Sequence, residues 1–272
     1  MTPSHQLDLR SRHPNFQEFL AINENESDQV RKEYHCLLNV KYGEAPLQNL
    51  DIFPSSTPNS PILIFIHGGY WKALDKSSYS FVAEPFIQKN ITVCIINYRL
   101  IPDVTMEGVL SDISSCIYWI QKNADKYNGD PKSLVLSGHS AGGHLALMAY
   151  LKNNDIRSNI LGICSLSGLF DLAPIKNSYL NDILQLNDRI VQQFSPTTKE
   201  LTQLKCPVLL TVGADETDLF IEQSKRLYQE NKSVSSLEYF EYPQLNHYEI
   251  VHKLGELDNP IVDFIFDRFK AK

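Results

Sequence analysis

A glycine-rich turn that carries a serine is the feature that most constrains this chain. It reads Gly138-His139-Ser140-Ala141-Gly142-Gly143 and lies between a strand-like apolar run and the helix-forming segment HLALMAYL. Glycines at positions 138 and 142 allow a tight turn in which side chains would collide with neighbouring elements. Such a turn predicts a strained Ser140 with an exposed Oγ at a helix N-terminus, where aligned peptide dipoles favour negative charge. Ser140 is therefore a candidate nucleophile, and the alternative is a serine that only caps a helix.

Strand-like and helix-like segments alternate along the chain from Pro61 onward. This rhythm predicts a mainly parallel sheet with helices on both faces. The predicted strands are Ile62–His67, Thr92–Asn97, Ser133–Ser137, Ile160–Leu166, Pro207–Val212 and Ser236–Glu241. Apolar residues at helical spacing predict helices over Met106–Lys126, Ala141–Leu151 and Phe220–Glu230.

Length and composition favour one α/β domain over residues 1–272, because folds of this class often form around a single sheet at this size. Residues 1–33 are polar, and we expect a surface segment there. The stretches Tyr34–Tyr42 and Leu47–Phe53 flank a Gly/Pro turn and predict an antiparallel hairpin at one sheet edge. Residues 171–196 interrupt the strand and helix rhythm, which predicts a short cap over the strand C-termini.

Charge and cysteine content exclude several kinds of partner. The net charge is −7, and Lys and Arg do not cluster as nucleic-acid binding requires, so we expect no nucleic acid. The apolar runs are strand-length, far below the roughly 20 residues of a spanning helix, and we expect no membrane contact.

No secretory signal is recognisable, and unpaired cysteines indicate free thiols in a reducing, cytoplasmic compartment. They are Cys36, Cys94, Cys116, Cys164 and Cys206, and none lies at metal-ligand spacing with histidine, so no metal is expected.

A pair of glycines follows the first predicted parallel strand, in the sequence His67-Gly68-Gly69-Tyr70-Trp71. Main-chain N–H groups at glycines can approach a substrate oxygen without obstruction by a Cβ atom. We therefore expect Gly68, Gly69 and Ala141 to form an oxyanion hole, and we expect a structural role for the neighbouring histidine. The two aromatic residues either line the substrate pocket or pack beneath the loop.

Candidates for the acid and the base follow the last two predicted strands. Three carboxylates, Asp215, Glu216 and Asp218, come after PVLLTV, and His247 comes after SSLEYFEY. Serine, then acid, then histidine is the chain order of the α/β-hydrolase fold. His247 would accept the serine proton while one carboxylate holds its other nitrogen. His252 is the weaker candidate for the base, and the residues alone leave the three carboxylates in competition.

Several segments together resemble the kynurenine formamidase branch of the α/β-hydrolases, a branch related to hormone-sensitive-lipase-like esterases. The likeness covers most of the chain from Tyr42 onward, in the segments YGEAPLQNLDIFP, HGGYW, NYRL, GHSAGGHL, GLFDLAPIKNSYLND, FIEQS and LNHYEIV. In this branch the acid lies at a fixed distance before the Gln-Ser of the FIEQS segment. That distance points to Glu216, where Asp is common, and Asp215 stays an alternative.

The resemblance implies a serine hydrolase without cofactor or metal that acts on a small-molecule substrate. Its first substrate class would be N-formyl aryl amides, with N-formyl-kynurenine cleaved to kynurenine and formate. A carboxylesterase for short-acyl esters needs the same residues and is the alternative. A third alternative is a non-catalytic ligand-binding homologue, which the complete set Ser140, Glu216 and His247 disfavours. A homodimer is compatible with the sequence.

Overall fold

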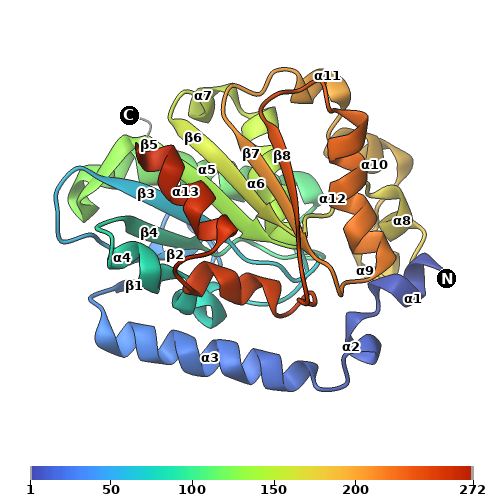
Figure 1. Cartoon of the computed structure of the whole chain (residues 1–272), viewed down its shortest axis with the longest axis horizontal. Coiled ribbons are helices and arrows are strands. Elements are labelled where there is room, and N and C mark those ends of the chain that lie inside the picture. Colours follow the sequence, from blue (N-terminus) through green and yellow to red (C-terminus); the bar gives the residue numbers. More distant parts are fainter. Residues whose placement is uncertain (1, 271–272) are drawn as a thin grey trace.

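A mostly parallel sheet forms the centre of the computed structural model, which describes residues 2–270 (Figure 1). In this part of the chain the sheet has eight strands in the order β1-β2-β4-β3-β5-β6-β7-β8. β2 pairs antiparallel with both β1 and β4, and the other neighbours are parallel. The strands are β1 (Leu37–Lys41), β2 (Asn49–Phe53), β3 (Ser60–Ile66), β4 (Thr92–Ile96), β5 (Gly129–His139), β6 (Ile160–Leu166), β7 (Val208–Gly213) and β8 (Leu237–Tyr242). The expected α/β architecture is confirmed.

The predicted strands and the edge hairpin are present, with small changes at their ends. β6 has the predicted bounds, while β5 begins four residues early, at Gly129, because Gly129 pairs with Ser60 across a register shift. β1 and β2 form the predicted antiparallel hairpin, and β1 is the edge strand.

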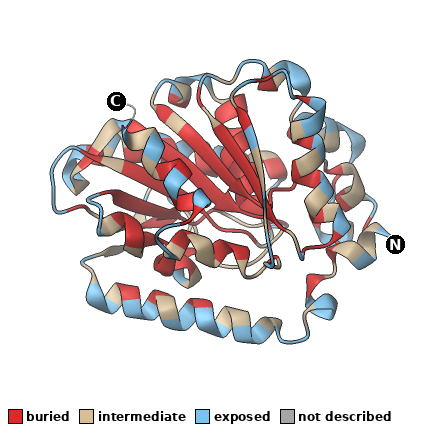
Figure 2. Cartoon of the chain, in the orientation of Figure 1, coloured by how far each residue is buried: buried red, intermediate tan, exposed pale blue. Residues whose placement is uncertain are grey.

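Helices cover both faces of the sheet, and Figure 2 shows their outer sides exposed and the central strands buried. The longer ones are α3 (Phe16–Glu33), α5 (Met106–Asn123), α6 (Ala141–Lys152), α12 (Asp218–Glu230) and α13 (Pro260–Lys270). The short ones are α1 (Pro3–Leu7), α2 (Leu9–Arg12), α4 (Glu84–Ile87), α7 (Asn154–Arg157), α8 (Ala173–Lys176), α9 (Asn181–Leu184), α10 (Asp188–Phe194), α11 (Thr198–Leu201) and the 3₁₀ segments η1 (Lys76–Ala83), η2 (Ala124–Tyr127) and η3 (Ile250–Gly255).

Strand side chains alternate between two hydrophobic cores, as the two-residue period of a strand requires. On β3, Ile62, Ile64 and Ile66 belong to the core that α5, α6 and α12 complete. Leu63 and Phe65 belong to the other core, which η1, α4, η3 and α13 complete. A strand buried on both faces explains why the sequence shows continuous apolar runs.

The N-terminal segment contains helices that its composition did not predict. α3 runs beside η1, along the lower edge of the molecule in Figure 1. Its buried residues are Asn23, Ser27 and Val30, so its inward face is mostly polar. Arg31 anchors α3 by donating to Ser80 Oγ at 2.8 Å.

Residues 171–196 form three short helices, α8 to α10, at one end of the sheet. α1 packs against α8 and α12. The Tyr179 N–H, in the loop between α8 and α9, donates to Ser4 Oγ at 3.1 Å. The N-terminal segment and residues 171–196 therefore meet on this side of the molecule.

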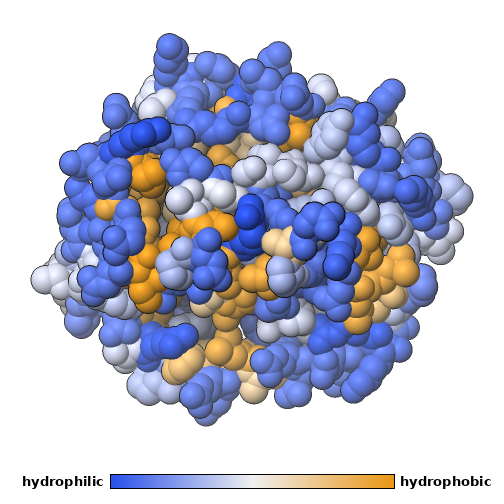
Figure 3. All heavy atoms as spheres, turned by 180° about the vertical axis from the view of Figure 1, so that it is seen from behind, coloured by the Kyte–Doolittle hydropathy of each residue, from blue (hydrophilic) through white to orange (hydrophobic). Residues whose placement is uncertain are grey.

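The face opposite to that of Figure 1 has hydrophilic residues around its rim and hydrophobic residues toward its middle (Figure 3). Within residues 2–270, no helix combines the length and the apolar composition needed to cross a membrane.

Candidate active site

Ser140 lies at the sharp turn between β5 and α6. Its backbone angles are φ 57° and ψ −120°, which a non-glycine residue rarely adopts. A Cβ atom on Gly138 would lie 2.3 Å from Gly142 O, and one on Gly142 would lie 1.9 Å from Ile66 O. Both glycines are therefore required by the close packing of this turn, for the reason predicted from the sequence. The turn presents Ser140 at the N-terminus of α6.

A cavity of about 270 Å³ opens beside Ser140. The N-terminal segment, the loop after β3, η1, the nucleophile turn, residues 179–180 and the segment after β8 all contribute to its lining. Its aromatic side chains are Phe16, Tyr70, Tyr79, Tyr179 and Tyr248. His139 and His247 lie on its inner wall together with Ser140. The cavity has the mostly apolar lining with a few convergent polar groups that is typical of a small-molecule site.

Glu216, and not Asp215, contacts His247. The His247 Nδ1–H donates to Glu216 Oε2 at 2.6 Å, and both side chains are buried. Glu216 Oε1 accepts from Gly213 N at 2.9 Å and from Ser167 Oγ. Asp215 is exposed to solvent. Because Nδ1 carries the proton toward the carboxylate, Nε2 of His247 is the nitrogen left to accept a proton.

The two remaining candidates from the sequence lie elsewhere. His252 pairs with Glu26 at 3.2 Å and stacks on Phe81, and it does not line the cavity. Asp218 is exposed at the start of α12.

The loop after β3 brings its glycines against the nucleophile turn. A Cβ atom on Gly68 would lie 2.9 Å from His139 O and 3.1 Å from Ser140 Cβ, so only glycine fits there. Gly69 has φ +103°, and Tyr70 and Trp71 follow with φ 50° and 58°. This tightly curled loop therefore packs against Ser140, next to the N-terminus of α6, where Ala141 lies.

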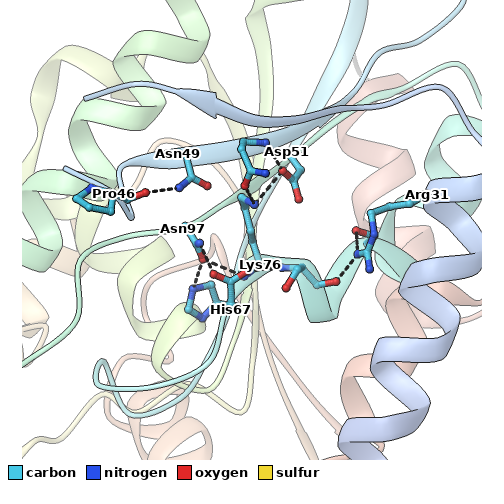
Figure 4. Close-up of polar contacts among 11 residues, drawn as sticks. Arg31, Pro46, Asn49, Asp51, His67, Lys76 and Asn97 are labelled. Atoms are coloured by element: carbon cyan, nitrogen blue, oxygen red, sulfur yellow. Dashed lines mark hydrogen bonds and ion pairs between the residues drawn. The ribbon is translucent and has the colours of Figure 1, made fainter. Parts of the chain in front are cut away.

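Polar contacts stabilise the loop after β3, and Figure 4 shows the cluster of these contacts around Asn97. His67 contacts Gly68 O through Nδ1 at 2.8 Å and Asn97 Oδ1 through Nε2 at 3.1 Å. The same Asn97 oxygen accepts from Lys76 N at 2.9 Å. Burial lowers the pKa of His67 to about 4, so the ring is neutral at physiological pH. His67 thus has surroundings that suit the expected structural role.

A buried ion pair continues the cluster toward the sheet edge. Lys76 Nζ lies 2.9 Å from Asp51 Oδ1, and Lys76 also donates to Asn39 Oδ1 at 2.9 Å (Figure 4). Asp51 accepts a second hydrogen bond from the Asn39 N–H at 2.7 Å. Because the lysine has two oxygen partners and the carboxylate accepts from two donors, these charges can be buried at the start of η1.

Tyr70 and Trp71 have different surroundings although they are adjacent. Tyr70 lines the cavity, and its hydroxyl donates to Leu7 O at 2.9 Å. Trp71 is fully buried beneath the loop, and its Nε1–H donates to His144 Nδ1 at 3.3 Å. His144 in turn donates from Nε2 to Phe194 O at 2.8 Å. The structure therefore places Tyr70 at the pocket and assigns Trp71 to packing, which corrects its candidacy as a substrate-binding residue.

Sequence reasoning missed the contribution of the N-terminal segment to the cavity. Leu7, Leu9 and Arg10 lie on its wall, and both leucines are buried. The signal was weak, because two leucines in a polar stretch form no helical or strand period.

Residues 2–270 include no group of three or more His, Cys, Asp or Glu side chains placed to hold a metal ion.

Comparisons with known proteins identify relatives that cover most of the chain. Residues 50–230 match the BD-FAE family model. Kynurenine formamidase from Danio rerio is 30% identical over 239 residues, which cover 84% of this chain and 80% of that protein. Kynurenine formamidase from Salmo salar is 28% identical over 243 residues, which cover 85% of this chain and 81% of that protein.

A solved structure shows the same arrangement of elements. Esterase B from Lactobacillus rhamnosis superposes with a TM-score of 0.72 at 18% identity, covering 97% of each chain. This likeness confirms the α/β-hydrolase fold that the sequence predicts.

Proposed function

The chain belongs to the kynurenine formamidase branch of the α/β-hydrolase superfamily, and we propose that it cleaves N-formyl aryl amides, with N-formyl-kynurenine as the first substrate to test. It is a hydrolase, as its relatives are. The observation that carries the proposal is the contact of Glu216 with His247 at 2.6 Å, beside a cavity that His247 shares with Ser140.

In the proposed reaction, Ser140 Oγ attacks the formyl carbon while His247 Nε2 takes the hydroxyl proton. The carbonyl π electrons move onto its oxygen, and main-chain N–H groups of Gly68, Gly69 and Ala141 stabilise that oxyanion. Glu216 stabilises the positive charge that develops on His247. When the tetrahedral intermediate collapses, its C–N bond breaks and His247 gives the proton to the departing aryl amine.

The second half of the reaction releases formate. Water attacks the formyl ester on Ser140, and His247 takes a proton from that water. Collapse of the second intermediate breaks the bond between the formyl carbon and Ser140 Oγ, and the proton returns to the serine. The net change is one amide bond cleaved by one water molecule.

The cavity lining supports an aryl leaving group. Phe16, Tyr70, Tyr179 and Tyr248 provide ring surfaces on the walls around Ser140. Aromatic pairs contribute about 0.5–1.5 kcal/mol each beyond buried area, which favours an aromatic substrate over an aliphatic one.

The test compares kcat/KM of purified protein for N-formyl-kynurenine, p-nitrophenyl acetate and p-nitrophenyl butyrate. We expect the formamide to exceed the butyryl ester, and Ser140→Ala to abolish turnover of all three while remaining folded. Preference for the butyryl ester with no formamide cleavage would replace this proposal by the carboxylesterase alternative. Failure of the intact protein to react with a fluorophosphonate probe would instead favour a non-catalytic homologue.

A further inference from the structure

The cavity beside Ser140 carries an excess of positive side chains at its wall. Among the described residues that line it, the charged side chains other than histidine are Asp8, Arg10 and Lys72. The chain as a whole has a net charge of −7, so two cations against one carboxylate run counter to the general composition.

The carboxylate of this group is already engaged within the protein. Asp8 Oδ1 accepts from Ser11 N at 3.2 Å, and Oδ2 accepts from Ser11 Oγ at 2.6 Å. Asp8 is the N-cap of α2 in this arrangement. It therefore stabilises a helix start, and within residues 2–270 no ion pair joins it to Arg10.

Arg10 keeps its donors free of carboxylate partners. Its guanidinium lies 5.1 Å from the centre of the Phe16 ring, and within residues 2–270 it makes no ion pair. Arg99 and Arg226 differ, because each is paired with a carboxylate. A guanidinium beside an aromatic wall retains the forked donors that match a carboxylate.

Contacts of the N-terminal segment hold this wall in place. Leu7 is fully buried, and its carbonyl oxygen accepts from Tyr70 Oη at 2.9 Å. Gln6 Oε1 accepts from the Leu219 N–H at the start of α12. Arg10 thus projects from an anchored segment that contacts both the oxyanion loop and α12.

The charge of Arg10 acts on the aromatic residues of the cavity. Burial raises the pKa of Tyr248 to about 12, and Arg10 opposes that rise. Burial and the charge of Asp8 raise the pKa of Tyr179, and Arg10 opposes that rise as well. Both effects agree with a position of the guanidinium close to these rings.

We propose that Arg10, with Lys72 as a second cation, binds a carboxylate on the leaving-group side of the substrate. The substrate class is then aryl amides whose amine part carries a carboxylate on its side chain, and formanilides without a carboxylate are poorer ligands. This inference rests on the proposed function, because it places the formyl group at Ser140 and the substrate carboxylate at the other end of the same cavity.

The experiment measures ligand affinity by calorimetry on the full-length protein, so it does not depend on turnover. Kynurenine carries the amino-acid group, and 2-aminoacetophenone has the same aryl ketone without it. The proteins are wild type, Arg10→Gln and Arg12→Gln. Arg12 is an exposed arginine on the same helix that does not line the cavity, which makes it the matched control.

We expect Arg10→Gln to weaken the binding of kynurenine by about two- to fivefold relative to that of 2-aminoacetophenone, as for a charge pair at an exposed arginine. The preference for kynurenine is the dissociation constant of 2-aminoacetophenone divided by that of kynurenine. Arg12→Gln should leave this ratio unchanged, and Lys72→Gln should lower it less than Arg10→Gln does. Added salt should reduce the preference of the wild type for kynurenine.

Two results would overturn the inference: equal ratios in Arg10→Gln and Arg12→Gln, or no preference for kynurenine in the wild type. The proposed function is tested apart from this. Arg10-dependent binding of kynurenine without formamide turnover would overturn the proposed function and keep the carboxylate subsite. Formamide turnover, with the same ratio of dissociation constants in Arg10→Gln as in the wild type, would keep the function and overturn the subsite.

Discussion

His139 donates a hydrogen bond from Nε2 to the main-chain oxygen of His247 at 2.9 Å. A carbonyl oxygen can only accept, so the proton of the His139 ring is on Nε2. Burial lowers the pKa of His139 well below its usual value, which keeps the ring neutral. His139, the residue before Ser140, thus holds the backbone of His247 in place. The bond fixes the nucleophile turn and the loop after β8 relative to each other.

The first prediction follows from this bond. His139→Leu removes the donor at similar volume, and we expect kcat for p-nitrophenyl acetate to fall about tenfold, since a small displacement of His247 suffices for such a loss. His139→Gln can present an N–H near the position of Nε2 and should recover part of the rate. A purely structural role would predict lower thermal stability for both variants with wild-type kcat at 25 °C.

The second prediction concerns the acid. Glu216→Gln should lower kcat by about 10³- to 10⁴-fold, because an amide cannot stabilise the imidazolium and favours the wrong tautomer. Asp215→Asn is the matched control on the neighbouring exposed residue, and we expect less than a twofold change. Steady-state kinetics on both purified variants decides, and the opposite ranking would transfer the role to Asp215.

The third prediction is a loss of stability in acid. Burial lowers the pKa of His67 and of His144 to about 4 in the folded protein, from 6.5. Between these values the unfolded chain binds more protons, so the free energy of unfolding falls as pH drops from 6.5 toward 4. Each ring contributes roughly 2 kcal/mol of this loss by pH 5.

Urea unfolding at several pH values measures this loss. His144→Gln serves as the control variant, because its side-chain N–H can still donate to Phe194 O but does not titrate. The decline below pH 6.5 should be shallower in this variant than in the wild type. An identical slope would exclude a contribution of His144.

Predictions from sequence succeeded where a local pattern alone determines structure. The run Ile160–Leu166 is buried along most of its length, so its apolar composition predicted a strand with the observed bounds. The turn at Ser140 required glycines at fixed positions, and the collisions that a Cβ would cause at Gly138 and Gly142 explain that pattern. Such signals are carried by consecutive residues.

The features that the residues alone left undetermined depend on contacts between distant parts of the chain. α3 buries Asn23, Ser27 and Val30, so its helical spacing is present without a hydrophobic period. The residues alone left Asp215, Glu216 and Asp218 in competition, and the family resemblance pointed to Glu216. A turn in which Glu216 N donates to Gly213 O directs that carboxylate toward the loop after β8.

The last prediction separates the two aromatic residues of the oxyanion loop. Their consecutive positive φ values break the simple alternation of side chains, which is why the sequence left both roles open. Trp71→Phe should lower the free energy of unfolding by about 1–3 kcal/mol, through lost packing and the lost bond to His144. Its effect on kcat/KM should be equal for N-formyl-kynurenine and p-nitrophenyl acetate, because the indole does not reach the cavity.

Tyr70→Phe is the counterpart, because it keeps the ring in the cavity and removes the bond to Leu7 O. That bond joins the oxyanion loop to the N-terminal wall. Without it the wall that carries Arg10 is held less firmly, and we expect KM for N-formyl-kynurenine to rise about two- to fivefold, the loss expected for one hydrogen bond, with a smaller change for the acetyl ester. Thermal melts and kinetics on both variants supply the comparison. A selective loss of the aryl formamide in Trp71→Phe, with Tyr70→Phe unchanged, would show that the roles are reversed.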